Sequence, residues 1–340
     1  MKKLLFPILL FFFQLCSWAQ SPSVAVIAFY NLENFYDTLN DPNKDDDEFT
    51  PAGINAYTPQ VFRKKIENLS DVVSRLGVEE DKEGISLLGV AEVENQDVVE
   101  ALCKSPKLVS RHLKCIVFDG PDKRSIDCGL IYNPKRFRVL QARSLTVPLD
   151  SGESPTRDVL YVYGKLDGEA VHVMVNHWPS RRGGEAATRP KRKLAASVDR
   201  RIADSLLKKD PMTRIIIMGD LNDDPIDESV TRVIGAKWKQ NELTPGDIFN
   251  PFTAFYKKGV GTLAYQDAWG LFDQIMISYG NVQPASRLLA YSHAEVYNRS
   301  FLIEKGGQYK GYPKRSYVNG HWNDGYSDHF PSIIYLKTSH

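Results

Sequence analysis

Six stretches of the sequence end an apolar run with side chains that can hold a metal ion or a phosphate. These side chains are Asn31 and Glu33, Glu92, Asn176 and His177, Asp220 and Asn222, Asp273, and Asp328 and His329. A single Asp or Asn after a strand is most often a turn former or a helix cap, so each stretch alone is weak support for a site. The informative feature is their combination, in this order, along one chain.

The stretch IIIMGDLNDDP, from Ile215 to Pro225, shows the pattern most clearly. Its β-branched residues predict a buried strand, and Asp220 and Asn222 follow directly. Two residues apart in an extended segment, these two side chains face the same way. The strand end therefore presents a carboxylate and an amide together.

The ordered set Asn, Glu, His, Asp-x-Asn, Asp and Ser-Asp-His resembles the endonuclease/exonuclease/phosphatase family, and the resemblance runs from about Val24 to Leu336. Members of that family include deoxyribonucleases, abasic-site endonucleases, sphingomyelinases and inositol-polyphosphate phosphatases. The resemblance implies a four-layer α/β sandwich, in which two packed mixed β-sheets are flanked by helices. It also implies an active site at one edge of the sheets, where water attacks a phosphoester with the help of a metal.

Phosphoester hydrolysis must activate a water, neutralise charge on phosphate oxygens and stabilise the leaving alkoxide. Mg²⁺ suits this chemistry and takes only one or two protein carboxylates; Mn²⁺ or Ca²⁺ are alternatives. The family pattern makes Glu92 the expected metal ligand, with Glu33 and Asp328 near the metal. Glu94 faces the same side of an extended chain as Glu92, so it is the competing candidate.

The resemblance also assigns roles in the reaction. It implies that Asp220 orients or deprotonates the water, that Asn222 contacts the scissile phosphate, and that Asn31 donates a hydrogen bond within the site. His329 is expected to contact the phosphate or to act as a general acid or base. Asp273 is expected to orient its imidazole.

A second histidine, His177, matches deoxyribonuclease-like relatives, and Asn176 accompanies it as an expected phosphate contact. Asp127 is a candidate partner for His177. Arg181, Arg182 and Arg157 are expected to contact substrate phosphates. The run from Arg189 to Lys193 is equally compatible with substrate contact and with the solvated start of a helix.

Apolar runs of strand length recur along the chain and predict the sheets that position these groups. They are Val24–Phe29, Ile85–Val90, Leu113–Phe118, Cys128–Tyr132, Leu160–Tyr163, Val171–Val175, Ile215–Met218, Gln274–Ile277 and Ile333–Leu336. Apolar residues at helical spacing predict helices over 62–76 and 194–206. Asp167-Gly168 predicts a hairpin between two of the strands. The acidic run Asp41–Glu48 lacks the ligand spacing of an EF-hand and is interpreted as a solvated loop.

The first residues have the features of a secretory signal. Two lysines precede an apolar run from Leu4 to Phe13, and Ala19 offers a cleavage site, so we expect a signal peptide over 1–19 and one catalytic domain over 20–340. The apolar run is too short for a membrane span. The mature chain would carry 41 basic and 42 acidic side chains, so net charge identifies no partner. Cys103, Cys115 and Cys128 would remain, and their count leaves the disulfide state open.

These observations favour a secreted or periplasmic, Mg²⁺-dependent phosphodiesterase, and most of all an endonuclease that acts on nucleic acid as a monomer without a membrane anchor. A phospholipid or inositol-phosphate phosphoesterase is the alternative within the same chemistry, because the motifs do not encode the leaving group. A binding protein that kept the fold and lost catalysis is the alternative from another class. It would lack Glu92, Asp220 or His329, and none is missing. The Gly-rich, aromatic stretch from Lys310 to Asp328 is expected to line the site.

Overall fold

A computed structural model describes residues 23–150, 152–283 and 288–338. Its main feature is two facing mixed sheets. The six-stranded sheet contains, in spatial order, β14 (Leu289–Val296), β17 (Ser332–Thr338), β1 (Val24–Phe35), β2 (Leu87–Val93), β4 (Asp127–Tyr132) and β3 (Lys114–Val117). The seven-stranded sheet contains β5 (Phe137–Leu145), β6 (Val159–Leu166), β7 (Glu169–His177), β8 (Ile215–Asp220), β13 (Asp273–Ser278), β10 (Ile248–Phe249) and β9 (Ala236–Lys237).

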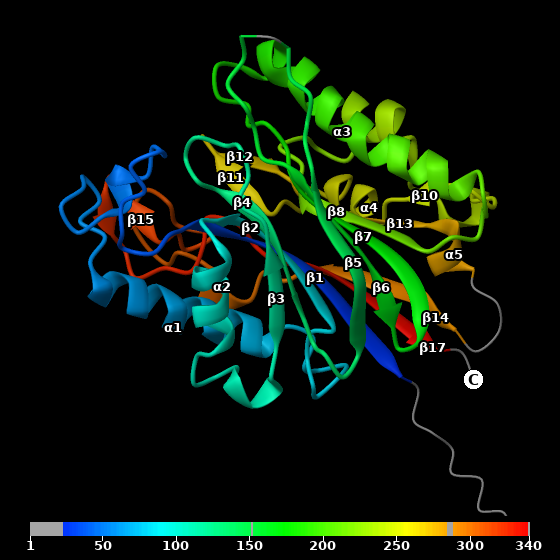
Figure 1. Ribbon diagram of the computed structural model, residues 1–340, viewed down its shortest axis with the longest axis horizontal. Coiled ribbons are helices and arrows are strands. Elements are labelled where there is room, and N and C mark those ends of the chain that lie inside the picture. The colour runs from blue at the N-terminus through cyan, green and yellow to red at the C-terminus, as the bar shows by residue number, and fades with distance from the viewer. Residues whose placement is uncertain (1–22, 151, 284–287, 339–340) are drawn as a thin grey trace, which may run out of the picture.

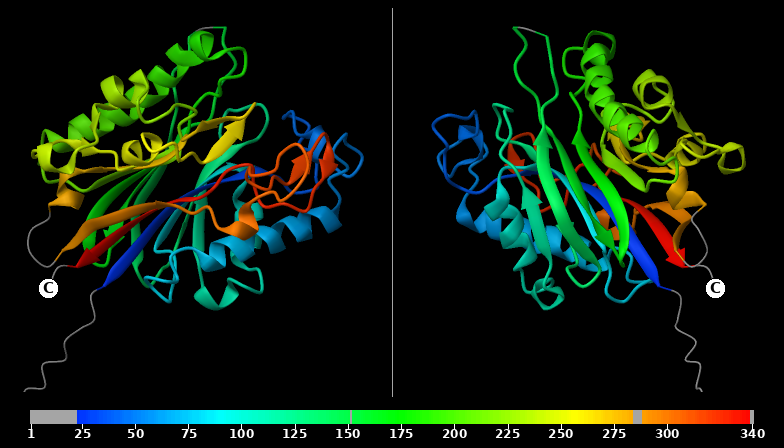
Figure 2. Two further views of the ribbon diagram at one scale, coloured as in Figure 1. Left: turned by 180° about the vertical axis from the view of Figure 1, so that it is seen from behind. Right: turned by 45° about the vertical axis from the view of Figure 1, so that its right-hand side comes forward.

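Helices cover the outer face of each sheet (Figures 1 and 2). α1 (Pro59–Arg75) and α2 (Gln96–Cys103) lie on the six-stranded sheet, and α3 (Glu185–Leu207) lies on the seven-stranded sheet. The short helices α4 (Phe252–Tyr256) and α5 (Tyr279–Val282) and the hairpins β11 (Leu263–Tyr265)–β12 (Ala268–Gly270) and β15 (Tyr317–Val318)–β16 (His321–Trp322) complete the fold. The predicted four-layer α/β sandwich is therefore confirmed.

All nine predicted strands are present, and so are both predicted helices. The hairpin between β6 and β7 turns at Asp167 and Gly168, both of which have positive φ angles, as a tight two-residue turn requires. The expected signal peptide lies outside the described residues. Among the helices that the structure describes, none has the length and apolar character needed to cross a membrane. Cys103, Cys115 and Cys128 carry free thiols.

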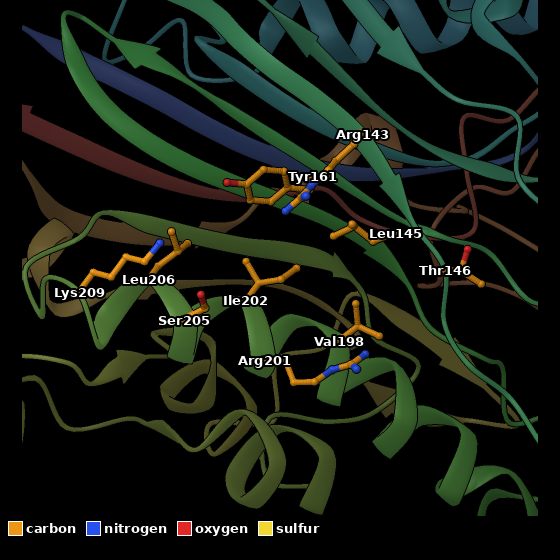
Figure 3. Close-up of a pocket in the computed structure, with 10 residues that line it drawn as sticks. All are labelled: Arg143, Leu145, Thr146, Tyr161, Val198, Arg201, Ile202, Ser205, Leu206 and Lys209. Carbon is orange, nitrogen blue, oxygen red and sulfur yellow. The ribbon is translucent and has the colours of Figure 1, made fainter.

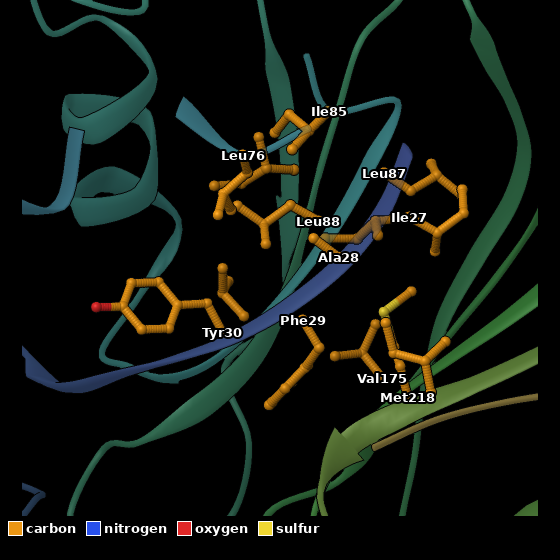
Figure 4. Packing of buried hydrophobic residues seen from close by; sticks show 14 of the residues in the cluster. Ile27, Ala28, Phe29, Tyr30, Leu76, Ile85, Leu87, Leu88, Val175 and Met218 are labelled. Carbon is orange, nitrogen blue, oxygen red and sulfur yellow. The ribbon is translucent and has the colours of Figure 1, made fainter. Parts of the chain in front are cut away.

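The inner faces of the two sheets form the main core (Figure 4). Phe29 of β1 packs toward Val175 and Met218 of the opposite sheet, and all three are fully buried. Gly89 of β2 leaves room for this packing, because a Cβ there would lie 2.6 Å from the Met218 sulfur. Close contact between the sheets in this region fixes how their strand ends face one another.

A second core lies between the seven-stranded sheet and α3. It contains one fully buried carboxyl group, that of Asp199 on α3, beside Asn176 and Trp178. Burial raises the pKa of Asp199 from 3.8 to about 8. The folded protein therefore keeps this proton at neutral pH, where the unfolded chain has lost it.

This carboxyl group makes stability depend on pH. Folding raises the pKa of Asp199, so the protonated carboxyl group contributes to the free energy of unfolding. This contribution is complete below about pH 4 and is lost as the pH rises through about 8. The Asp199→Asn variant lacks this titrating group. The free energy of unfolding of the native protein minus that of the variant should therefore fall by about 1 kcal/mol per pH unit between pH 6 and 8. Urea titrations of both proteins at pH 6, 7 and 8 measure this difference, and a constant difference would contradict the prediction.

Candidate active site

Three polar side chains lie next to one another at the end of the seven-stranded sheet. His177 ends β7, Asp220 ends β8, and Asp273 begins β13. His177 pairs with Asp220 across the parallel strands β7 and β8, and Asp220 pairs with Asp273 across the antiparallel strands β8 and β13. The strand register therefore brings together three residues that lie far apart in the sequence.

The facing sheet contributes Asn31 from β1 and Glu92 from β2. The Asn31 side-chain amide donates to Glu92 Oε1 at 3.2 Å and to Asp220 Oδ2 at 3.0 Å, so one residue links the two sheets. His177 Nε2 lies 3.8 Å from Glu92 Oε1 and 3.7 Å from Asp220 Oδ2. Residues from both sheets thus form one compact polar cluster.

Unusual backbone conformations position these groups. Glu33, Asn34, Glu92 and Asn222 all have φ angles near +50°, a region that L-residues rarely occupy. At Glu92 the pairing of β2 with its neighbours shifts, so the regular alternation of side chains is broken. Glu92 accepts the Asn34 N–H, whereas Glu94 accepts the Asp37 N–H in a neighbouring loop. Glu92 therefore lies in the cluster, as the prediction that it is the metal ligand requires, whereas Glu94 lies beside the neighbouring loop.

His329 and Asp273 form a buried hydrogen-bonded pair. His329 Nδ1 lies 2.7 Å from Asp273 Oδ2, which directs Nε2 toward Asp220 and Asp328, each 3.9 Å away. Burial alone would lower the pKa of His329, but the Asp273 and Asp220 carboxylates outweigh burial and raise it well above the usual value. His329 is thus a cation facing the centre of the cluster.

The pKa values of Asp220 and His177 shift for related reasons. Burial, with repulsion from Asp273 and Glu92, raises the pKa of Asp220 to about 6 even though His329 opposes the shift. Burial and the nearby Arg157 and Arg124 lower the pKa of His177 well below its usual value. At neutral pH, Asp220 is therefore mostly ionised and His177 is neutral.

Glu33 and Asp328 lie at the outer side of the cluster. Glu33 accepts the Ser316 N–H at 2.6 Å, and burial together with the Asp328 carboxylate raises the pKa of Glu33 to about 7. Asp328 lies 3.6 Å from the Arg315 guanidinium. Sequence reasoning missed Arg315, because no strand end or motif marks it.

The donor set fits a hard divalent cation. The Glu92 side chain is partly exposed, and its oxygens accept the side-chain N–H of Asn31 and the backbone N–H of Asn34. Burial, and then repulsion from neighbouring carboxylates, raises the pKa of Asp220 and of Glu33, and a bound cation would oppose both effects. Asp220, Asp273 and His329 also place ligand atoms within 4.8 Å of one another. Because Asp273 and His329 bind each other, we interpret those two as a pair that handles protons.

Asn176 lies where a phosphate cannot reach it. It is fully buried, donates to the Met218 carbonyl and accepts the Trp178 indole N–H. Neighbours on a strand point to opposite faces, so His177 faces the cluster while Asn176 faces α3. The expected phosphate contact is therefore corrected to a structural role. Asp127 is likewise not paired with His177 and accepts the Gly120 N–H instead.

Two of the three expected phosphate-binding arginines have other partners. Arg157 is buried and binds the Trp178 carbonyl at 2.7 Å and Asp122 at 3.3 Å. Arg181 donates to the Asn222 carbonyl at 2.8 Å. Its remaining partners are the carboxylates of Asp223, Asp224 and Asp227. Arg157 and Arg181 therefore bind carbonyl and carboxylate groups of the protein itself. Of the three arginines, the exposed Arg182 is left as the candidate for phosphate contact.

The partners of Arg181 predict its effect on stability. Arg181→Ala removes the cation that Asp224 and Asp227 share and leaves Asp223 with Arg192 alone, so the free energy of unfolding should fall by about 1–3 kcal/mol. Arg182→Ala, at the exposed neighbouring position, should leave it nearly unchanged. Urea unfolding of both variants checks the prediction, which would be wrong if the two variants were equally stable.

Two cavities differ in their relation to this cluster. One, of about 460 Å³, lies between α3 and the outer face of β5 and β6 (Figure 3). No carboxylate lines it, and it lies away from the strand ends, so it is not the reaction site. The other, of about 880 Å³, is lined by residues that include Arg182, Tyr265, Trp269 and Phe272, and Phe272 directly precedes Asp273 of the cluster.

The two facing sheets and the buried carboxylate–imidazole cluster define a phosphoesterase-type hydrolase. Residues 26–338 match the sequence model of the Endonuclease/Exonuclease/phosphatase family, so the chain belongs to this family. Members of the family generally depend on divalent metals. Among curated proteins, none matches the sequence.

Solved structures share the fold. A humanised TDP2 from D. rerio is 15% identical, with a TM-score of 0.54 over 93% of this chain and 99% of that chain. A mannosyl-6-phosphatase from Bacteroides thetaiotaomicron is 13% identical, with a TM-score of 0.55 over 92% and 99%. A family protein from the same bacterium is 12% identical, with a TM-score of 0.54 over 94% and 99%. At these identities the likeness establishes the fold alone.

Proposed function

We propose that the protein is a secreted phosphodiesterase that hydrolyses nucleic-acid phosphodiester bonds with the help of a divalent metal ion. Mg²⁺ is the ion that we expect. The observation that carries the proposal is the Asn31 amide, which holds Glu92 and Asp220 together beside the His329–Asp273 pair. This arrangement supports the roles proposed for these residues, with Glu92 as the metal ligand, Asp220 as the base and His329 as the cationic imidazole.

The pKa shifts suit the chemistry of water attack. Asp220, with a pKa of about 6, is mostly ionised at neutral pH and accepts the proton of the attacking water. The water oxygen bonds to phosphorus as the bond to the leaving alkoxide breaks. The protonated His329, held by Asp273, stabilises the negative phosphate oxygens or protonates the leaving group.

Glu92 would hold the cation, with Glu33 and Asp328 as further carboxylates on the same side. A bound divalent cation neutralises phosphate charge and lowers the pKa of bound water. Asn222, whose amide also donates to the Trp178 carbonyl, is kept beside Asp220 for a phosphate contact.

The choice of nucleic acid rests on the surroundings of the cluster. The stretch from Lys310 to Asp328 brings basic and aromatic side chains beside Asp328 and His329. Among proteins of this fold, a TDP2 has been solved with a single-strand DNA product, and another is a mannosyl-6-phosphatase. A sugar phosphate, a phospholipid and an inositol phosphate are therefore the competing substrates within the same chemistry.

The deciding experiment is hydrolysis of five substrates side by side, with Mg²⁺ or Mn²⁺ and again with excess EDTA. The panel holds plasmid DNA, RNA, mannose 6-phosphate, sphingomyelin and an inositol phosphate. Metal-dependent cleavage of DNA or RNA is expected, and EDTA should abolish it reversibly. If only the other three esters were hydrolysed, the proposed nucleic-acid substrate would be wrong. Inactivity on all five substrates would support the binding-protein alternative.

We also propose export, on the basis of the sequence over 1–19 with its paired lysines, short apolar run and Ala19. N-terminal sequencing of protein recovered from its native cells should begin at Gln20. A chain that keeps its first residues would contradict the proposal.

A further inference from the structure

A row of four aromatic side chains starts beside the catalytic cluster. Phe330 directly follows His329, and its ring stacks against Trp269 with centroids 6.1 Å apart. Trp269 meets Tyr312 at 6.0 Å, and Tyr312 meets Tyr309 at 5.8 Å. We call Phe330, Trp269, Tyr312 and Tyr309 the aromatic row.

The other end of the aromatic row, at Tyr309, also lies close to the catalytic cluster, through Arg315. The guanidinium of Arg315 lies over the Tyr309 ring, 5.1 Å from its centroid, and 3.6 Å from Asp328. Because Asp328 and His329 are adjacent, the row and Arg315 form a partial ring around them. Figures 1 and 2 show the hairpin β11–β12, which carries Trp269, at the same end of the molecule as the loop of β15.

Hydrogen bonds hold the row together. Tyr312 donates to Asp267 Oδ1 at 2.6 Å and accepts the Asp267 N–H at 2.7 Å, so the hairpin is fastened to the loop. Phe330 N–H donates to the Thr262 carbonyl at the start of the hairpin. Trp269 nevertheless leaves 40% of its surface exposed. A large aromatic ring that is held in place and left uncovered beside an active site indicates a binding surface.

The charge around the row favours an anionic chain. The exposed Arg182 lines the same cavity as Trp269, and the loop that carries Tyr309 and Tyr312 also carries Lys305, Lys310, Lys314 and Arg315. The carboxylates at the row are engaged, since Asp267 binds Tyr312 and Asp328 pairs with Arg315. Proteins that bind single-stranded nucleic acid combine basic side chains for the backbone with aromatic rings for the bases. A lipid would instead require a continuous apolar surface, whereas Arg315 and the carboxylates of Asp267 and Asp328 interrupt this one.

We propose that Trp269, held in place by the buried Phe330 and by Tyr312, is a stacking platform for single-stranded DNA or RNA. Trp269 takes the base of the nucleotide next to the scissile phosphate, and Arg315 binds a phosphate of the same strand. This inference rests on the proposed nucleic-acid substrate and goes beyond it, because it predicts preference for unpaired strands and identifies the ring that creates it. Trp269 is a specificity residue that contacts substrate and takes no part in the bond cleavage.

The test compares binding of two eight-unit strands with the same backbone, oligo-dT and an abasic-spacer strand that has no bases. Affinity is measured with EDTA present, so that no cleavage occurs. Trp269→Ala should weaken binding of oligo-dT by about 5- to 100-fold and leave the spacer strand unchanged. Trp269→Phe should restore most of the loss. Trp238→Ala is the matched control, since Trp238 is also 40% exposed but lies on a different part of the surface.

Each other outcome overturns the platform. Equal binding of oligo-dT by the native protein and Trp269→Ala would show that no base stacks there. An equal loss for both strands would show a general effect on charge or folding. If the native protein does not bind oligo-dT, the platform fails as well. Cleavage of plasmid DNA and RNA tests the proposed function separately from the role of Trp269. If the native protein cleaves nucleic acid but Trp269→Ala binds oligo-dT as tightly as the native protein, only this inference is refuted. If the native protein cleaves neither substrate, the proposed function is refuted.

Discussion

Asp220→Asn is expected to reduce turnover of the preferred phosphoester by about 100- to 10,000-fold, the usual contribution of a general base. The substitution keeps the size of the side chain and removes the group that accepts the proton from water. It also removes a negative charge beside His329, so the pKa of His329 should fall. Initial rates at saturating metal measure the first effect, and a histidine NMR titration measures the second.

A second buried carboxyl group offers a matched control. Asp199 is as fully buried as Asp220 but lies on the α3 side of the same sheet, and its pKa of about 8 keeps it protonated at neutral pH. Asp199→Asn should therefore keep near-native turnover. If both variants lost activity equally, the loss would reflect replacement of a buried carboxyl group by an amide and would not identify a base. If Asp220→Asn remained active, Asp220 would not be the base.

Glu92→Gln is expected to weaken binding of the divalent cation by more than about 100-fold, because even the partners of metal ligands typically contribute about 10- to 100-fold. The positive φ angle of Glu92 and its contact with the Asn34 N–H direct this carboxylate into the cluster. Calorimetric titration of the protein with Mn²⁺ measures the affinity directly. Activity at low metal concentration should fall in parallel.

Glu94→Gln is the control two residues away. Glu94 is also buried, and its pKa is raised to about 7, first by burial and then by neighbouring carboxylates. It accepts the Asp37 N–H, a bond that a glutamine oxygen can keep. Native-like Mn²⁺ affinity in Glu94→Gln, beside loss in Glu92→Gln, would establish the site. The reverse result would assign the metal to the neighbouring loop.

The sequence was sufficient to predict the strands whose two faces are both buried. Strands such as β1 and β8 are continuous apolar runs, so their positions were clear. The strands β5 and β14 were missed because each lies at a sheet edge and is largely half-buried or exposed, which leaves a mixed polar pattern. The short helix α2 was missed for a similar reason, since eight residues contain too few turns for a clear periodicity.

For the site, residue types could be predicted and backbone geometry could not. Asp220 and His177 each end a strand and Asp273 begins one, and strand register brings the three together. The selection of Glu92 over Glu94 depends on a local break in the strand that no side-chain pattern reveals. Asn176 was misassigned because adjacency to His177 in sequence means opposite faces in a strand. Arg181 was misassigned because a cation near a site can serve neighbouring carboxylates as well as a substrate.

The link that Asn31 makes between the sheets has a consequence for when the protein becomes active. Asn31 lies in the first strand, β1, which pairs with the last strand, β17, while His329 lies just before β17. The reaction centre thus joins residues about 300 positions apart in the chain. No partly synthesised chain that lacks His329 can assemble it. A catalytic centre built in this way can act only after both ends of the domain have been synthesised and the two sheets have closed.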